Sequence, residues 1–313
     1  SDAGIDVSQY GGVDKQITVD GSLYELPFRN DFWVLFYNKD IFDAAGVEYP
    51  TNDMTFEEYD ALARQVADPT FGAQVYGTHY HTWRSAVQLF GVLDGKHSIL
   101  DGEYDFFKPY YEMVLGQEDD QICRNYADLS AEGLHYSAAF SGGDVAMMNM
   151  GSWFISTMIA NLQSGEYDSS LCGNWGMVKY PHAEGVEAGS TLGTITGLSV
   201  TSVSEQKQAA FDFVAWGSGA EGAKVMAETG NFPALMNDEV AGIISGLDGF
   251  PTDDASKEAL NVSNLYLEVP YAENVSAIND ILDTYHKSIM NREISIDDGI
   301  AAMNEEVGKV LAQ

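Results

Sequence analysis

Residues 139–154, AFSGGDVAMMNMGSWF, contain the clearest change of secondary structure in the chain. Two adjacent glycines predict a turn, and the apolar run after them predicts a buried strand. Gly151 and Ser152 then predict a helix start, with Trp153 in the first turn. A tryptophan at such a junction can form the wall of a ligand cleft, because its flat face can stack on a sugar ring while helix-start amides bind hydroxyl groups. From residue type alone, a core tryptophan is the alternative.

Strand-like and helix-like segments alternate along the rest of the chain, which predicts an α/β or α+β fold. Residues 23–37, LYELPFRNDFWVLFY, are β-like because they are rich in aromatic residues and carry a proline near their start. Thr55 and Glu58 have the spacing of a capping box. Further strands are expected at 174–180 and 194–201, and further helices at 209–216, after Ser204, and from Ser295 onward.

The composition limits the function classes. The 313 residues are enough for about two domains. The formal net charge is −33 at pH 7, which repels phosphate backbones and anionic lipid head groups. We therefore expect neither nucleic-acid binding nor direct binding to a membrane surface. The charge favours a neutral or cationic ligand without choosing between the two.

No membrane span or leader is expected from the sequence. The longest uncharged stretch, residues 145–165, could cross a bilayer by length, but its polar residues favour a buried strand, a turn and a helix. The first residues have neither the basic start nor the apolar core of a signal peptide, so we expect that the chain is cytosolic or has been cleaved.

Three further patterns concern a disulfide, a metal site and a nucleotide site. Cys123 and Cys172 match no zinc spacing, and the sequence leaves open whether they form a disulfide or stay as buried thiols. His79 and His81 form an H-x-H pair, but without a third ligand at a coordinating spacing we expect no metal. Residues 217–222, GSGAEG, fit G-x-G-x-x-G but follow a helical pattern, so we expect a helix–helix turn and no nucleotide cofactor.

Four segments resemble, in order, those of family 1 extracellular solute-binding proteins, which include the maltose-binding protein. Residues 21–40, GSLYELPFRNDFWVLFYNKD, are similar to the family's crossing strand. Residues 42–59 are similar to the segment that follows it, with Phe56 in place of the usual tryptophan, and residues 213–233 resemble a helix pair. The fourth segment carries the family's spaced residues Phe140, Gly143, Ala146, Met147, Met148, Gly151 and Trp153.

The resemblance implies a two-lobe, periplasmic-binding-protein-like (type II) α/β fold with hinge crossing strands. It divides the chain into a remnant of lobe one with the crossing strand (1–28), lobe two (29–190), the return segment of lobe one (191–250) and the C-terminal helices of lobe two (251–313). Family members usually carry several strand–helix units before the crossing strand. The resemblance therefore implies an N-terminal truncation of on the order of a hundred residues.

The function implied by the resemblance is that of the substrate-binding subunit of an ABC importer. Such a protein captures a sugar or short oligosaccharide by hinge closure, without a cofactor, and delivers it to membrane permease subunits. We expect a monomer, either periplasmic or attached to the cell surface by a lipid anchor that this sequence does not include. The implied ligand-binding residues are Trp153, Tyr80, Asp31, Asn30, Arg29, His79, Trp83, Thr194 and Glu268.

The resemblance implies a ligand-binding role for these residues for different reasons. Asp31 is similar to a hinge carboxylate that accepts hydrogen bonds from ligand hydroxyls, a role that suits sugars. Tyr80 stands at the family's stacking position, and Thr194 at the return crossing between the lobes. Glu268 lies near the third crossing, together with Tyr271 and Asn274.

Other functions stay open at this stage. With 48 acidic residues, carboxylate pairs can arise by chance, so a carbohydrate-active hydrolase is an alternative. The sequence contains neither a G-x-S-x-G elbow nor H-E-x-x-H. The remaining alternatives are a binder of a non-sugar solute such as a peptide, and an adhesin or scaffold without a small ligand.

Overall fold

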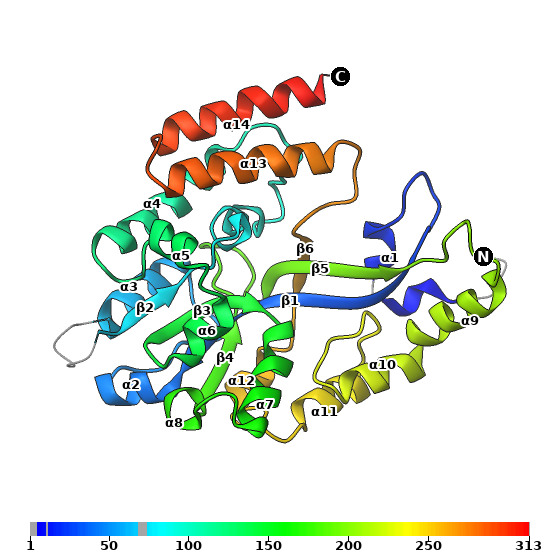
Figure 1. The fold of residues 1–313 in the computed structure, drawn as a ribbon, viewed down its shortest axis with the longest axis horizontal. Helices are drawn as coiled ribbons and strands as arrows, with labels where there is room; N and C mark the ends of the chain where they lie inside the picture. The colour runs from blue at the N-terminus through cyan, green and yellow to red at the C-terminus, as the bar shows by residue number, and fades with distance from the viewer. Residues whose placement is uncertain (1–4, 11, 68–73, 313) are drawn as a thin grey trace.

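Strand β1, Leu26–Asn38, joins the two parts of the molecule (Figure 1). The computed structural model describes residues 5–10, 12–67 and 74–312. The first half of β1 pairs antiparallel with β5, Ser190–Leu198, and the second half pairs antiparallel with β3, Val145–Gly151. Figure 1 shows β1 and β5 running side by side from the larger part to the smaller part, so these two strands are the main connection between the parts.

Three shorter strands complete the sheet. Strand β2, Tyr76–His79, lies parallel to β3, and β6, Asn264–Leu267, lies parallel to β5. Strand β4, Trp175–Lys179, pairs antiparallel with the second half of β1. The resulting order is β2-β3-β1-β5-β6, with β4 also on β1. This mixed sheet with helices around it confirms the expected α/β class.

Strand β1 is apolar along its second half because it is buried on both faces. Trp33, Leu35 and Tyr37 belong to one hydrophobic core, and their neighbours Phe32, Val34 and Phe36 belong to the other. Successive side chains of a strand point to opposite faces, so one continuous apolar run fills two cores.

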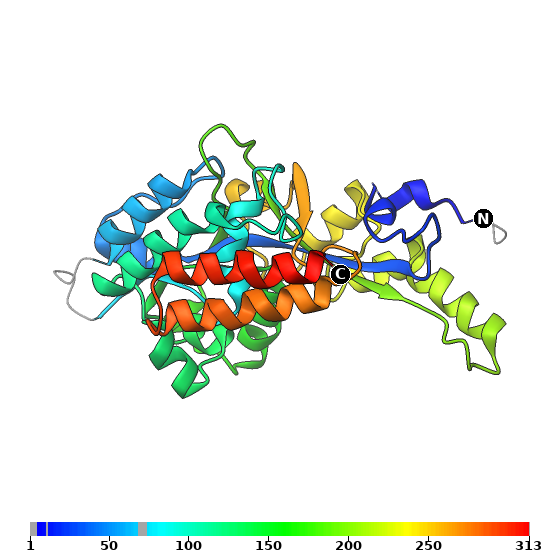
Figure 2. The same cartoon turned by 90° about the horizontal axis from the view of Figure 1, so that it is seen from above.

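The helices cover both cores. Helices α13 and α14 lie side by side over the larger part in both views (Figures 1 and 2). Helices α9, α10 and α11 belong to the smaller part (Figure 1). The helices are α1 Val13–Gln16, α2 Lys39–Ala45, α3 Phe56–Val66, α4 Lys108–Asp119, α5 Tyr126–Glu132, α6 Tyr136–Ser141, α7 Trp153–Ser164, α8 Ser169–Cys172, α9 Lys207–Gly217, α10 Ala220–Ala227, α11 Asp238–Ser245, α12 Asp254–Glu258, α13 Val275–Met290 and α14 Ile296–Leu311. Short 3₁₀ helices span Val7–Tyr10, Arg84–Ala86, Gln88–Val92 and Asp105–Phe107.

Two predicted helix starts are confirmed in atomic detail. The Glu58 N–H donates to Thr55 Oγ1 over 3.2 Å, and the Thr55 N–H donates back to Glu58 Oε2 over 2.9 Å, so the capping box before α3 is complete. Ser295 Oγ accepts from the Asp298 N–H at the start of α14. Before α9 the expected Ser204 does not cap the helix, because the cap position is Gln206.

The other sequence expectations have mixed outcomes. The strand expected at 174–180 is β4, and the strand expected at 194–201 begins earlier, at Ser190. GSGAEG is a helix–helix turn, since α9 ends at Gly217 and α10 begins at Ala220. Cys123 and Cys172 are both buried free thiols, which decides against a disulfide. Among the described residues, no helix is long and apolar enough to span a membrane.

Candidate ligand-binding site

Trp153 stands at the junction of β3 and α7, as the sequence predicts, and is half-buried. Its ring folds back over Gly151, where an added Cβ would lie 2.1 Å from the ring. Only a glycine leaves room for this arrangement. Gly151 pairs with Trp33 across the β1–β3 ladder, which brings the Trp33 and Trp153 rings edge to face at 6.0 Å.

A third tryptophan completes an aromatic surface. Trp83 lies 6.4 Å from Trp33 and 6.3 Å from Trp153, measured between ring centroids. Trp33 is fully buried, whereas Trp83 is 39% exposed. His81 and Tyr136 pack against Trp83 at 4.5 Å and 5.7 Å. We call Trp83, Trp153, His81 and Tyr136, with Trp33 beneath them, the aromatic face.

His81 on this face and His79, two residues before it, are neutral at neutral pH. Burial lowers the pKa of His81 to about 4, and the nearby charge of His135 acts in the same direction. Burial lowers the pKa of His79 to about 3, helped by His81 and Arg124. Neutral imidazoles keep their capacity for hydrogen bonds without adding charge, which suits an uncharged ligand.

The loop that carries Trp83 is anchored by the next residue, Arg84. Arg84 is buried, and its Nε donates to Asn279 Oδ1 on α13 over 2.9 Å. Its Nη2 donates to the same oxygen, and its Nη1 donates to Gln88 Oε1. These acceptors are amide oxygens, so the guanidinium is held by dipoles, and burial lowers the pKa of Arg84.

A polar group borders the aromatic face on the same side of β1. Asp31 is buried, forms an ion pair with Arg29 at 2.8 Å, and accepts a hydrogen bond from Ser152 Oγ at 2.9 Å. Ser152 Oγ in turn accepts from the Phe32 N–H. Burial raises the pKa of Asp31, while Arg29 and Ser152 act to lower it. Because Ser152 immediately precedes Trp153, this bond places the carboxylate beside the aromatic face.

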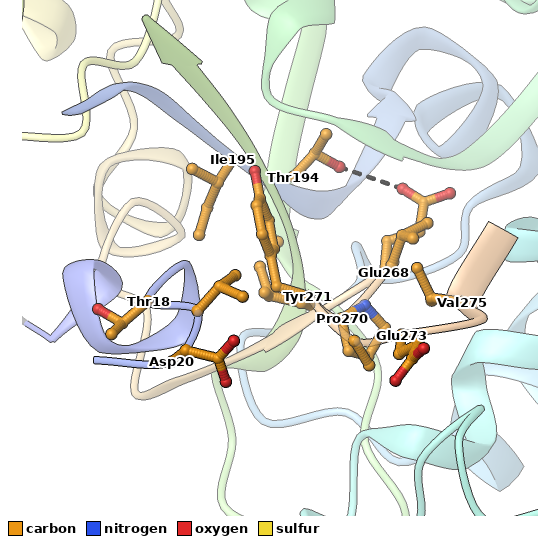
Figure 3. Close-up of a pocket in the computed structure, with 14 residues that line it drawn as sticks. Thr18, Asp20, Thr194, Ile195, Glu268, Pro270, Tyr271, Glu273 and Val275 are labelled. Atoms are coloured by element: carbon orange, nitrogen blue, oxygen red, sulfur yellow. Dashed lines mark hydrogen bonds between the residues drawn. The ribbon is translucent and has the colours of Figure 1, made fainter. Parts of the chain in front are cut away.

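A second carboxylate lies across the β1–β5 ladder. Thr194 is the register partner of Asp31, and its Oγ1 donates to Glu268 Oε2 over 3.1 Å (Figure 3). Both residues line a cavity of about 1160 Å³ whose other walls include Asp20 and Tyr271 (Figure 3). Trp83 and Trp153 are not part of that lining. The Asp31–Thr194 pair therefore links the cavity to the aromatic face.

The structure brings together most of the residues that the sequence singled out. Those near the aromatic face or the polar group are Trp153, Trp83, Asp31, Arg29, Thr194 and Glu268.

Three of the predicted residues lie elsewhere. Tyr80 is buried in the core and its hydroxyl donates to Gln117 Oε1 over 3.0 Å, so its ring is not available for stacking on a ligand. His79 is buried, and its Nε2 has no partner among the described residues. Asn30 points to the opposite face of β1 from Arg29 and Asp31, because side chains alternate along a strand.

Several residues of the candidate site were not predicted from the sequence. Trp33 reads as core because it lies in an apolar run, and Ser152 reads as a helix start, although its hydroxyl goes to Asp31. The H-x-H pattern of His79 and His81 does not indicate that the His81 ring packs against Trp83. Across residues 5–10, 12–67 and 74–312, no group of three or more His, Cys, Asp or Glu side chains is arranged to hold a metal ion. The two-residue spacing of Arg29, Asp31 and Trp33 was the one available indication that they share a face.

The chain matches one known protein family and several known structures. The family described as bacterial extracellular solute-binding protein matches residues 6–245. A sugar transporter from Rhizobium etli, solved in an open conformation, has 48% sequence identity and a TM-score of 0.89, and the match covers 98% of this chain and 77% of that one. No curated protein matches the chain.

Two more distant structures share the fold. An ABC substrate-binding protein from Listeria monocytogenes in complex with cycloalternan has 23% identity and a TM-score of 0.81, with 100% of this chain and 78% of that chain covered. The GacH receptor of Streptomyces glaucescens, solved unliganded and with acarbose, has 20% identity and a TM-score of 0.75, with 99% and 77% covered. At these identities the likeness shows the fold alone.

Proposed function

Because the chain belongs to the bacterial extracellular solute-binding proteins, we propose that it is the substrate-binding subunit of an ABC importer and captures a sugar or short oligosaccharide between two lobes. The 48% identical relative from Rhizobium etli is described as a sugar transporter, and the relatives from Listeria and Streptomyces were solved with cycloalternan and acarbose. The family consists of binding proteins and not of enzymes, so we set the hydrolase alternative aside.

The observation that carries the proposal is the placement of Asp31 beside Trp153. Sugars present an apolar C–H face and a rim of hydroxyl groups. Half-exposed tryptophans can stack on the first, and carboxylates accept charge-assisted hydrogen bonds from the second. The aromatic face supplies the stacking surface, and Asp31 and Glu268 supply the acceptors.

Hinge closure then follows from the connection between the lobes. We assign residues 1–28 and 191–250 to lobe one and residues 29–190 and 251–313 to lobe two, with β1 and β5 as crossing strands. A ligand favours closure only by binding the closed state better than the open one. We further propose that the closed monomer delivers its sugar to membrane permease subunits, from a periplasm or from a lipid anchor on the cell surface.

A thermal-shift panel of mono- and oligosaccharides tests the function. One sugar class should raise the unfolding temperature in a dose-dependent manner, because a ligand that binds only the folded state stabilises it by RT ln(1 + [L]/Kd). The panel should include short peptides as the competing ligand class. A shift with peptides and none with sugars would contradict the proposal.

A further inference from the structure

A second cavity lies on the opposite side of β1 from the aromatic face. Its volume is about 750 Å³, within the range of small-molecule sites. Asn30 and Phe32 form part of its wall, whereas Arg29 and Asp31 do not. This division follows from the alternation of side chains along β1. The cavity and the aromatic face therefore have β1 in common and no lining side chain in common.

Besides β1, the walls come from three segments that are far apart in the chain. One is the N-terminal segment from Ser8 to Gln16, another runs from Ala234 into the first turn of α11, and the third is residues 260–266, which lead into β6. A ligand in this cavity would touch all three segments at once. Such a ligand would therefore connect segments that lie on both sides of the β1–β5 connection.

The lining carries a single acidic side chain although the protein is strongly acidic. Asp238 is its single Asp, Glu, Lys, Arg or His, in a chain with 48 acidic residues. Carboxamides are frequent instead: Gln9, Gln16, Asn30, Asn237, Asn261 and Asn264. Each carboxamide carries both donors and acceptors, so the wall matches a ligand rich in hydroxyl groups better than an ion. Phe32 and Leu265 add apolar surface.

Asn30 lines the cavity and carries a side-chain oxygen that is turned away from it. Its backbone N–H donates to Phe232 O over 3.1 Å, but its side-chain Oδ1 is buried and has no partner among the described residues. A buried polar atom without a partner destabilises the folded protein. A hydroxyl group from a bound molecule would remove that destabilisation after a rotation of the amide toward the cavity.

We propose that this cavity is a second binding site, for a neutral polyhydroxylated molecule of mono- or disaccharide size. Asn30 and the other carboxamides bind its hydroxyls, and Phe32 and Leu265 contact its apolar face. The site is separate from the aromatic face and goes beyond the proposed capture function.

Met236 provides a local reporter, since it lines this cavity and carries an NMR-visible methyl group. The chain has 11 methionines, and the Met236→Leu variant assigns the resonance in ¹³C-methyl-methionine protein. The probes are maltose, trehalose and sucrose. At least one should shift the Met236 resonance saturably in the wild type and also in Trp153→Ala, in which the aromatic face is damaged.

Two variants on α11 form a matched pair. Ala241 lines the cavity, so Ala241→Trp should fill it and abolish the Met236 shift. Gly242 is the next residue and is exposed, and an added Cβ there meets nothing within 4 Å, so Gly242→Trp should keep the shift. Asn30→Leu provides a second variant if the filled protein is unstable, and it should weaken the affinity at least tenfold.

Two outcomes would overturn the second site. One is the absence of a saturable Met236 shift with all three sugars. The other is a shift that disappears in Trp153→Ala and persists in Ala241→Trp, because it would then report hinge closure around a ligand on the aromatic face. Tryptophan fluorescence monitors the aromatic face. If a sugar leaves this fluorescence unchanged while it still shifts the Met236 resonance, the result would count against the capture function alone.

Discussion

Ser152 donates a hydrogen bond from its Oγ to Asp31 Oδ1 over 2.9 Å, although the two residues are 121 positions apart in the chain. The same Ser152 oxygen accepts from the Phe32 N–H, so one hydroxyl ties the start of α7 to the crossing strand twice. This arrangement fixes the carboxylate on one side of Ser152 and Trp153 on the other. The Ser152 N–H also donates to Phe32 O over 2.7 Å, so this residue sets the position of the hydroxyl acceptor relative to the stacking surface through both its backbone and its side chain.

Replacing Ser152 with alanine should destabilise the protein by about 1–3 kcal/mol, because the buried Asp31 carboxylate and the Phe32 N–H both lose a partner. Urea unfolding of Ser152→Ala, Asp31→Ala and the double variant measures the coupling in a double-mutant cycle. We expect a coupling free energy of about 0.5–3 kcal/mol. Strictly additive effects would contradict a direct interaction.

Trp153→Ala should weaken binding of the sugar identified by thermal shift by at least about 2 kcal/mol, the scale of a buried aromatic contact in a binding hot spot. Calorimetric titration measures the affinity. Trp216→Ala is the matched control, because Trp216 is an exposed tryptophan on α9, outside the aromatic face, and should leave the affinity unchanged. Equal affinity of a folded Trp153→Ala variant would exclude Trp153 from the site.

Gly151→Ala tests the position of the Trp153 ring without removing it. The new Cβ would lie 2.1 Å from the ring and must displace it, so we expect weaker sugar binding in a protein that still folds. Gly308→Ala on α14 is the control, since its Cβ would meet nothing within 4 Å. Undiminished affinity in Gly151→Ala would show that binding does not need the ring in this place.

Asn279→Leu removes the amide oxygen that accepts from two nitrogens of the buried Arg84 guanidinium. A hydrogen bond to a charged group contributes about 1.5–3 kcal/mol, so the unfolding free energy should fall by an amount of this order. The neighbouring Asp280→Leu, at an exposed position of the same helix, should have a much smaller effect. Chemical denaturation compares the two variants.

Glu118 should make stability depend on pH. Burial raises the pKa of this carboxyl from 4.5 to about 7, so the folded protein holds a proton that the unfolded chain has lost. The contribution of this bound proton to the free energy of unfolding is complete below pH 4.5 and is lost as the pH rises through 7. Glu118→Gln should therefore gain stability relative to the wild type over this interval in thermal unfolding. Parallel pH profiles of the two proteins would refute the assignment, and Asp119→Asn, at a mostly exposed side chain, is the control.

The sequence was sufficient for the local structure and the family. Strand β1, the capping box at Thr55, the helix from Ser295 and the junction at Trp153 all follow from patterns within a few residues of one another. The two-lobe, periplasmic-binding-protein-like fold implied by the resemblance is confirmed by the matching family and structures. Short-range patterns succeed here because backbone propensity, capping and side-chain periodicity are local properties.

The make-up of the site depended on tertiary structure. The β1–β3 register sets Trp33 opposite Gly151, and the β1–β5 register sets Thr194 opposite Asp31. The same packing turns Tyr80 into the core and Asn30 to the far side of β1, although each has a neighbour at the site. Contacts between residues more than a hundred positions apart depend on how strands and helices pack, and a shift of one residue in a strand would exchange its two faces. The sequence by itself therefore determined which segments form strands and helices and which family they belong to, and only the folded chain decided which of their side chains meet.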